Sequence, residues 1–151
     1  MAKRVQVFLL DQRYRSLRGK IKKLAEKVLN FLTKEGVTLE VYLVSGATMR
    51  TLNKRFRSQE EATNVLSFEA GNPADFFEVK LRQEKKFREL GEVYLCPSYI
   101  VRNEESLEKM LVHGILHLFH YRHRRKSDTI RMENLERKIG RVFIDKKPLY
   151  L

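Results

Sequence analysis

The chain has 151 residues, and its 31 Lys and Arg against 19 Asp and Glu give a net charge of +12. This length suits a single domain over residues 1–151 with a buried core, and a hydrophobic share of 42% is that of an ordinary globular protein. The apolar run from Val5 to Leu10 is too short for a signal peptide or a membrane span, so we expect a cytoplasmic protein. The single cysteine, Cys96, excludes an internal disulfide, and we expect a core residue without a catalytic role.

The excess of positive charge predicts a polyanionic partner. A surface rich in ion pairs would also explain a charged content of 33%. Paired networks, however, would not leave so large an excess of one sign. We therefore expect contact with nucleic acid rather than a merely solvated basic surface.

Hydrophobic periodicity predicts two strands and two helices in the first part of the chain. Lys3 to Leu10 alternate as a strand, and apolar residues recur at helical spacing from Leu17 to Leu32. Gly36 is a plausible end for that helix. Thr38 to Val44 then form a second expected strand, followed by a short helix from about Ala47 to Phe56.

Two further strands are expected at Val65 to Phe68 and at Gly91 to Cys96. The charged stretch between them, Phe76 to Arg88, is expected to be a loop or an irregular helix. Pro97 is suited to the first turn of a helix, and we expect one long helix from there to about Phe119.

The last expected helix runs from Ser127 to about Phe143, with an inward face of Met132, Leu135, Ile139 and Val142. Strands and helices alternate early in the chain and then give way to helices alone. This order predicts a single α+β domain with a four-stranded mixed sheet packed with about five helices.

Every histidine of the chain lies in one short segment. His113 and His117 are four positions apart, so on a helix their side chains lie on one face within reach of a single ion. On an unbroken helix His123 would lie about 9 Å beyond His117 and could not bind that ion. If the helix ends near Phe119 and the chain folds back, His123 completes a site of three nitrogens with an open fourth position, as in catalytic zinc sites.

Two other interpretations of these histidines remain open. A histidine pair on a helix face is commonly a surface or core feature without any metal. His113, His117 and His120 also share a helical stripe, but the first and last would lie about 10 Å apart along the axis, against metal–nitrogen bonds of about 2 Å. We therefore favour His113, His117 and His123 as ligands of one divalent ion. Zinc is the first choice, and nickel and copper also suit imidazole.

The residue after the first histidine limits the reaction. Zinc peptidases with the pattern H-E-x-x-H use that glutamate as the general base. This chain has Gly114 at that position. A metallopeptidase is therefore the least favoured function.

Three separate blocks of the sequence match one set of motifs. The histidine block keeps His113, Gly114, Leu116, His117, Leu118, Tyr121 and His123 of the pattern H-G-x-L-H-L-x-G-Y-D-H. Leu52 to Arg57 and Ala62 to Phe68 are similar to L-N-x-x-Y-R and P-T-[DN]-V-L-S-F. Leu90 to Pro97 are similar to L-G-[DE]-[IV]-x-[IL]-C-P. Together these blocks resemble the YbeY family of bacterial metal-dependent endoribonucleases, whose fold agrees with the α+β prediction.

The resemblance implies an endoribonuclease specific for single-stranded RNA. It implies a role in ribosomal RNA processing, including maturation of the 3′ end of 16S RNA, and in ribosome quality control. The implied partners are ribosomal RNA and the small ribosomal subunit, and no membrane is involved. One divalent ion would be held by His113, His117 and His123.

The resemblance also implies which residues act on RNA. Arg57 corresponds to the arginine of the family motif, and a guanidinium fits the geometry of a phosphate whose charge grows in the transition state. Arg57 and His113 are thus the expected catalytic residues. Arg57, Ser67 and Arg122 are the expected substrate-binding residues, although the Ser67 hydroxyl can equally be satisfied by backbone.

The chain departs from the family pattern after the second histidine. His120 stands in place of glycine, and Arg122 stands in place of aspartate, which removes a carboxylate close to the metal. These departures motivate a second hypothesis, a non-catalytic, ribosome-associated RNA-binding factor with a structural metal. Four protein ligands around the ion would favour that factor, and an open coordination position would favour the enzyme.

Overall fold

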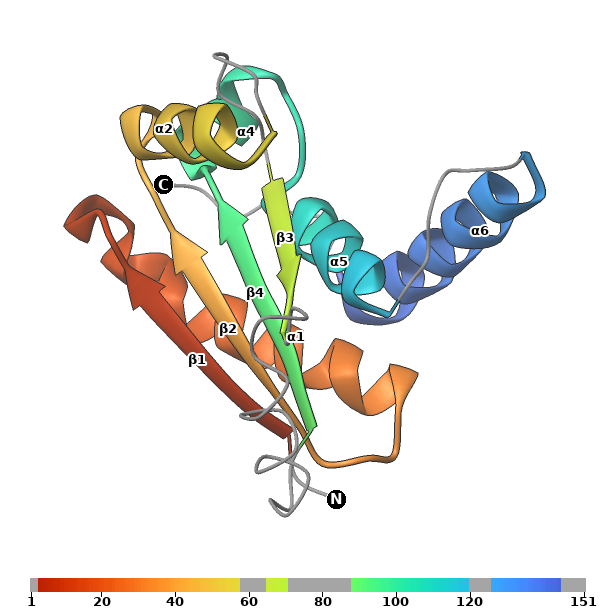
Figure 1. Ribbon diagram of the computed structural model, residues 1–151. Helices are drawn as coiled ribbons and strands as arrows, with labels where there is room; N and C mark the ends of the chain where they lie inside the picture. The colour runs from red at the N-terminus through yellow and green to blue at the C-terminus, as the bar shows by residue number, and fades with distance from the viewer. Residues whose placement is uncertain (1–2, 58–64, 71–87, 120–125, 145–151) are drawn as a thin grey trace.

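The computed structural model describes residues 3–57, 65–70, 88–119 and 126–144, which form a mixed sheet and its covering helices (Figure 1). The strands are β1 (Lys3–Leu9), β2 (Val37–Leu43), β3 (Val65–Glu69) and β4 (Arg88–Leu95), in the spatial order β1-β2-β4-β3. The helices are the short 3-10 helix η1 (Gln12–Leu17) and the α-helices α1 (Arg18–Leu32), α2 (Gly46–Arg57), α4 (Pro97–Arg102), α5 (Leu107–Leu118) and α6 (Lys126–Phe143). The predicted α+β fold, with four strands and about five helices, is confirmed for these residues.

Side-chain alternation places the core on one face of the sheet. β1, β2 and β4 are parallel, and along β2 every second residue from Val37 to Leu43 is buried. α1 packs on β1, whereas α5 packs on β3 and β4, so these two helices cover the same face (Figure 1). Their buried side chains and those of the strands form one continuous core.

β3 runs antiparallel to β4 at the edge of the sheet. The last pair of this ladder joins Glu69 to Gly91, and this position of β4 requires a glycine. Gly91 has φ +136°, and a Cβ built there would lie 2.0 Å from the carbonyl oxygen of Phe68. Only glycine tolerates both conditions. β4 begins at Arg88, earlier than the expected start at Gly91, and the rest of the stretch expected to be a loop or irregular helix lies outside the described residues.

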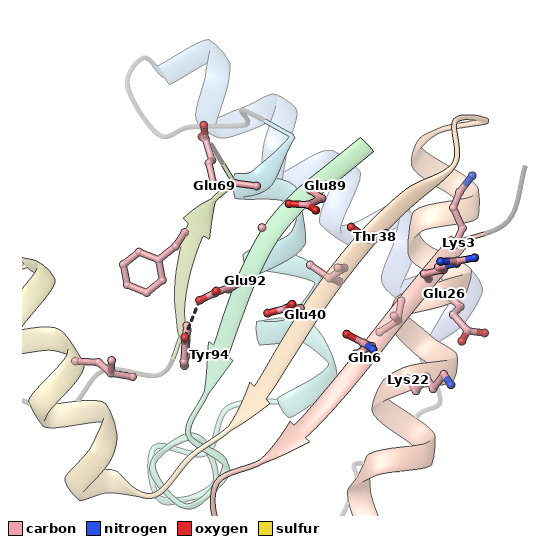
Figure 2. Close-up of a pocket in the computed structure, with 17 residues that line it drawn as sticks. Lys3, Gln6, Lys22, Glu26, Thr38, Glu40, Glu69, Glu89, Glu92 and Tyr94 are labelled. Atoms are coloured by element: carbon pink, nitrogen blue, oxygen red, sulfur yellow. Dashed lines mark hydrogen bonds between the residues drawn. The ribbon is translucent and has the colours of Figure 1, made fainter. Parts of the chain in front are cut away.

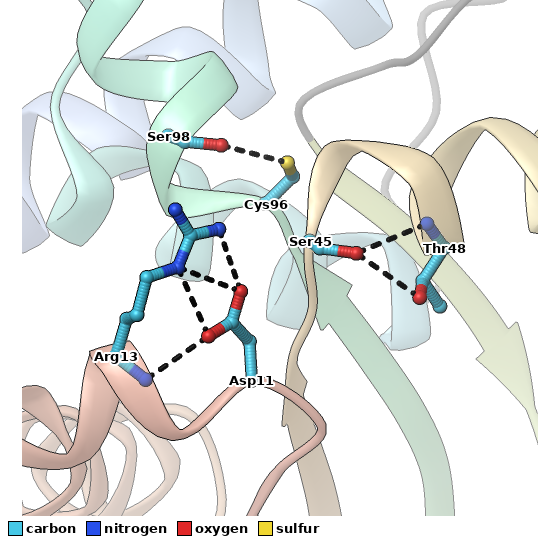
Figure 3. Close-up of polar contacts among 6 residues, drawn as sticks. All are labelled: Asp11, Arg13, Ser45, Thr48, Cys96 and Ser98. Carbon is cyan, nitrogen blue, oxygen red and sulfur yellow. Dashed lines mark hydrogen bonds and ion pairs between the residues drawn. The ribbon is translucent and has the colours of Figure 1, made fainter.

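Polar side chains make hydrogen bonds just beyond the carboxyl ends of the parallel strands (Figure 3). After β1, a carboxylate oxygen of Asp11 accepts a hydrogen bond from the backbone N–H of Arg13 at 3.0 Å. After β2, Ser45 Oγ accepts from the backbone N–H of Thr48 at 3.2 Å and so caps the start of α2. The thiol of Cys96, which follows β4, is fully buried, as expected for a core residue.

The prediction of one long helix from Pro97 through the histidines is wrong. α4 ends at Arg102, and Glu104 then takes a φ of 56°, a left-handed conformation that an α-helix cannot continue through. Ser106 starts a new helix, because its Oγ accepts from the backbone N–H of Lys109 at 3.2 Å. The first two histidines therefore lie on α5, which has its own N-terminal cap.

α6 packs against α5 and is the longest helix that the structure describes. Met132 and Ile139 are fully buried, as predicted, but Val142 is 60% exposed and the prediction that it faces inward is wrong. Phe143 takes the inward position instead and packs edge-on against Phe31 of α1 with the ring centroids 5.8 Å apart. Neither α6 nor any other helix among the described residues has the length and apolarity needed to cross a membrane.

Candidate metal centre

α5 is buried over most of its circumference because apolar residues occur on nearly every side of it. His113 and His117 interrupt that surface and remain partly exposed, and the side chain of His113 is 26% exposed. The two polar side chains therefore lie among mostly buried apolar residues of α5. The buried residues of the helix around this pair are Leu111, Val112, Gly114, Ile115, Leu116 and Leu118.

The structure brings the rings of His113 and His117 together. Their Nε2 atoms lie 3.0 Å apart, and the ring centroids lie 4.5 Å apart. Two nitrogens bound to one tetrahedral ion at about 2.0–2.1 Å would lie about 3.3 Å apart, so a small adjustment of either ring would admit an ion. The same spacing allows one ring N–H to donate to the other ring nitrogen. The donor atoms and their separation fit a divalent metal.

A carboxylate lies against His113 at the ring nitrogen that does not face His117. Glu136 of α6 places Oε1 3.1 Å from Nδ1 of His113, and its side chain is 28% exposed. Glu136 was not among the site residues predicted from the sequence. One signal was present: Glu136 is an acidic residue one turn after Met132 and three positions before Ile139, on the face of α6 that was expected to be apolar.

α5 ends where a three-histidine site requires a change of direction. Its last residue is Leu118, and the backbone N–H of Phe119 makes the final bonds to the helix. Residues 120–125 lie outside the described part of the chain, and they include His120, Arg122 and His123. Among the described residues alone, no group of three or more His, Cys, Asp or Glu could hold a metal ion. The third ligand and the role of Arg122 therefore stay predictions.

Gly114 lies in close contact with the sheet. A Cβ built on it would lie 2.8 Å from Cγ1 of Val93 and 3.0 Å from Cγ2 of Val65. The backbone carbonyl of Gly114 accepts a hydrogen bond from Ser67 Oγ at 2.9 Å. A glutamate at this position would be driven into β3 and β4, so this helix cannot supply the general base of an H-E-x-x-H peptidase. The Ser67 contact ties the histidine helix to the sheet.

Arg57, the expected catalytic arginine, is the last residue of α2. Its side chain is outside the described part of the structure, and its role stays a prediction. A different set of cations is described at the start of the chain. The exposed basic residues of η1 and α1 are Arg13, Arg15, Arg18, Lys20, Lys22, Lys23 and Lys27.

The opposite face of the sheet contains a hollow of about 890 Å³ (Figure 2). Glu40 and Glu92 are paired in register on its floor, and each accepts a 2.6 Å hydrogen bond from a tyrosine, Tyr42 or Tyr94. Burial, and then the neighbouring carboxylate, raises the pKa of both tyrosines, so their hydroxyls remain donors. The two histidines do not line this hollow, which is therefore separate from the candidate metal centre.

The fold and the imidazole pair define an α+β protein with a helix-borne site that fits a metal ion. Comparison with known proteins identifies the family within that class. Residues 9–143 match the family described as Endoribonuclease YbeY. The chain belongs to the YbeY family of endoribonucleases, which confirms the membership expected from its motifs.

Three relatives illustrate the match, each named endoribonuclease YbeY. The protein of Ruthia magnifica subsp. Calyptogena magnifica is 33% identical over 124 residues, which span 76% of this chain and 78% of that protein. The protein of Wolbachia sp. subsp. Drosophila simulans (strain wRi) is 31% identical over 144 residues, 89% of this chain and 92% of its own. The protein of Aquifex aeolicus (strain VF5) is 34% identical over 132 residues, 83% and 81% of the two chains.

A solved structure shares the fold. The solution structure of TM1509 from Thermotoga maritima superposes with a TM-score of 0.52, covering 97% of this chain and 99% of that one. The two sequences are 22% identical, so this similarity supports the arrangement of strands and helices alone.

Proposed function

We propose that this chain is a metal-dependent endoribonuclease that cleaves single-stranded RNA during ribosomal RNA processing, including the 3′ end of 16S RNA, and in ribosome quality control. The observation that carries the proposal is the 3.0 Å separation of the Nε2 atoms of His113 and His117. It occurs in a chain whose relatives are named endoribonucleases. The family match supports the reaction class, and the histidine pair supports the use of a metal.

His113, His117 and His123 are the residues that would hold the ion. Three neutral imidazoles suit zinc with one coordination position left open, and nickel and copper are the alternatives. When bound, a divalent ion supplies Lewis-acid chemistry for an in-line displacement at phosphorus. His123 lies six positions after His117, beyond the end of α5, so it belongs to the segment that would have to fold back toward the pair.

The chain's own residues would orient the RNA and the site. Arg57 would bind the scissile phosphate through two parallel N–H donors and stabilise its growing charge. The hydroxyl proton of Ser67 is donated to Gly114, so Ser67 would support the site and could approach RNA only as an acceptor. Arg122 would add a further contact to the phosphate backbone.

The charge of the chain supports a nucleic-acid substrate. The net charge is +12, and the exposed cations of η1 and α1 offer phosphate contacts outside the histidine helix. We place the protein in the cytoplasm as one domain over residues 1–151, with ribosomal RNA and the small ribosomal subunit as partners.

The test is cleavage of a labelled single-stranded RNA and of the same strand annealed to its complement. Metal-loaded wild-type protein should cleave the single strand only. His117→Ala should lose both the metal and the cleavage. Arg57→Ala should keep the metal and cleave roughly 10²–10³-fold more slowly, the typical effect of removing one group that stabilises transition-state charge.

The controls separate the competing functions. Wild-type protein that retains metal and binds RNA without cleaving it would support the RNA-binding factor and overturn the enzyme. Equal cleavage by wild type and His117→Ala would also overturn the proposal, because the nuclease would then not depend on this site.

A further inference from the structure

The contact between Glu136 and His113 is not explained by the motifs or by the family match. The two residues lie 23 positions apart, on α6 and α5, and Glu136 Oε1 is 3.1 Å from His113 Nδ1. Both side chains are about three-quarters buried, with exposed fractions of 28% and 26%. The contact is therefore partly shielded from water.

α6 is fixed on both sides of Glu136, so the carboxylate is held toward α5. Met132 lies one turn before Glu136 and Ile139 three positions after it, and both are fully buried. Towards the end of the helix, Lys138 Nζ lies 5.7 Å from the ring centroid of Phe31 on α1. These contacts anchor α6 without involving the histidines.

The chemistry of the contact determines which ring nitrogen of His113 can bind a cation. An ionised carboxylate only accepts hydrogen bonds, so the partner nitrogen Nδ1 carries the hydrogen. In a neutral imidazole the other nitrogen, Nε2, then carries no hydrogen and has the lone pair that can bind a cation. Nε2 is the atom that lies 3.0 Å from Nε2 of His117.

We propose that Glu136 is a positioning residue, whose carboxylate holds the His113 ring in the orientation and tautomer that present Nε2 to a divalent ion. The proposal rests on the metal site of the proposed function. It places a carboxylate from α6 behind the first ligand, in a chain whose Arg122 replaces the family's aspartate. Carboxylates behind metal-binding histidines commonly have this role.

A purely structural role for Glu136 makes a different prediction. If the contact only joined α6 to α5, removing its charge would lower stability slightly and leave the metal affinity of the folded protein unchanged. The decisive measurement is therefore metal affinity in variants that are shown to be folded.

The experiment uses the full chain, with zinc affinity measured by competition with a coloured chelator and the absorption spectrum of the cobalt(II) form recorded in parallel. Glu136→Gln keeps the length of the side chain and removes its charge, and should weaken zinc binding 10–100-fold and alter the cobalt spectrum. Glu133→Gln removes the same charge from an exposed position of α6 and should bind like the wild type.

Nitrogen NMR of metal-free wild-type protein reads the tautomer of His113 without any variant. Hydrogen on Nδ1 is expected, and hydrogen on Nε2 would overturn the proposal, as would unchanged zinc affinity and cobalt spectrum in a folded Glu136→Gln. If the wild type bound neither metal, the proposed function would fail instead, and the NMR spectrum would still show whether His113 has the tautomer that the contact with Glu136 requires.

Discussion

The hydroxyl of Ser67 on β3 donates a 2.9 Å hydrogen bond to the carbonyl oxygen of Gly114 on α5, across 47 positions of sequence. Gly114 lies between the two histidines in the chain, and the side chains of Val65 and Val93 occupy the space that a Cβ would need. The backbone of the histidine helix therefore rests directly on the two strands. The helix can approach the sheet this closely only because Gly114 has no side chain.

Gly114→Ala should destabilise the fold by about 1–3 kcal/mol, the usual cost of forcing an extra carbon into a packed core. The new Cβ would meet Val93 Cγ1 at 2.8 Å and Ser67 Oγ at 3.1 Å, so the helix would have to move away from the sheet. Urea unfolding gives the free energy. Zinc affinity should fall in the same variant, because α5 carries both histidines.

Gly19→Ala is the matched control for this substitution. Gly19 lies in the first turn of α1, is exposed, and has nothing within 4 Å of the position of a new Cβ. Alanine there should be neutral or stabilise by up to about 1 kcal/mol, since it restricts the unfolded chain and favours a helix. Equal urea midpoints for Gly114→Ala and the wild type would contradict the close contact described above.

The elements that the sequence predicted correctly are those whose residues follow a local hydrophobic or polar periodicity. The alternation in β2 and the spacing of His113 and His117 are periodicities of a strand and a helix, and both can be found without knowing the tertiary structure. The break between α4 and α5 depends on one backbone conformation, at Glu104, in a stretch without a glycine or proline that would indicate it. Such a break is not visible in hydrophobic periodicity.

Contacts between distant segments could not be predicted in the same way. The approach of Glu136 to His113 follows from how α6 packs on α5, which no pattern within either helix specifies. The outward position of Val142 has the same origin, because Phe143 reaches Phe31 of α1 instead. Part of the site therefore becomes visible only in the assembled fold.

Zinc should stabilise the wild-type protein against unfolding and not the His117→Ala variant. A ligand that binds only the folded state adds about 2.7 kcal/mol when its free concentration is 100 times its dissociation constant. The midpoint of thermal unfolding should rise with zinc and return to its starting value with a chelator. Magnesium, which prefers oxygen ligands, is the control ion. A midpoint that rises equally in His117→Ala would place the zinc elsewhere.

Stability should fall at alkaline pH because of the tyrosines on the open face of the sheet. Burial and the adjacent glutamates raise the pKa of Tyr42 and Tyr94 in the folded state above the ordinary value of 10.0. Below about pH 10 both states hold these protons, so this contribution to stability is fully present; above it the unfolded chain loses them first and stability decreases.

Urea unfolding of the wild type and Tyr94→Phe between about pH 7 and pH 11 tests this prediction. Tyr94→Phe removes the hydrogen bond to Glu92, which lowers stability at neutral pH by about 1.5–3 kcal/mol. Its stability should decline less steeply above pH 10 than that of the wild type. Parallel curves for the two proteins across the alkaline range would show that Tyr94 ionises as readily in the folded state as in the unfolded state.

The cations of α1 should contribute to RNA affinity through phosphate contacts. Lys23 and Lys27 are exposed and four positions apart, so they extend from the same side of the helix. Each phosphate contact on single-stranded RNA contributes about 0.7 to the slope of log affinity against log salt. A double Lys23→Gln, Lys27→Gln variant should reduce that slope by up to about 1.4.

The matched control removes the same charge from two other helices, as Arg102→Gln on α4 with Arg131→Gln on α6, both exposed. If the basic side of α1 binds the RNA backbone, the α1 variant loses more affinity at low salt than this control, although both have the same net charge. Equal losses would mean that RNA responds to the total charge of the protein and that α1 has no particular role. Cleavage of a saturating amount of RNA should be the same in both variants, because these four side chains lie outside the histidine site and their removal weakens RNA capture alone.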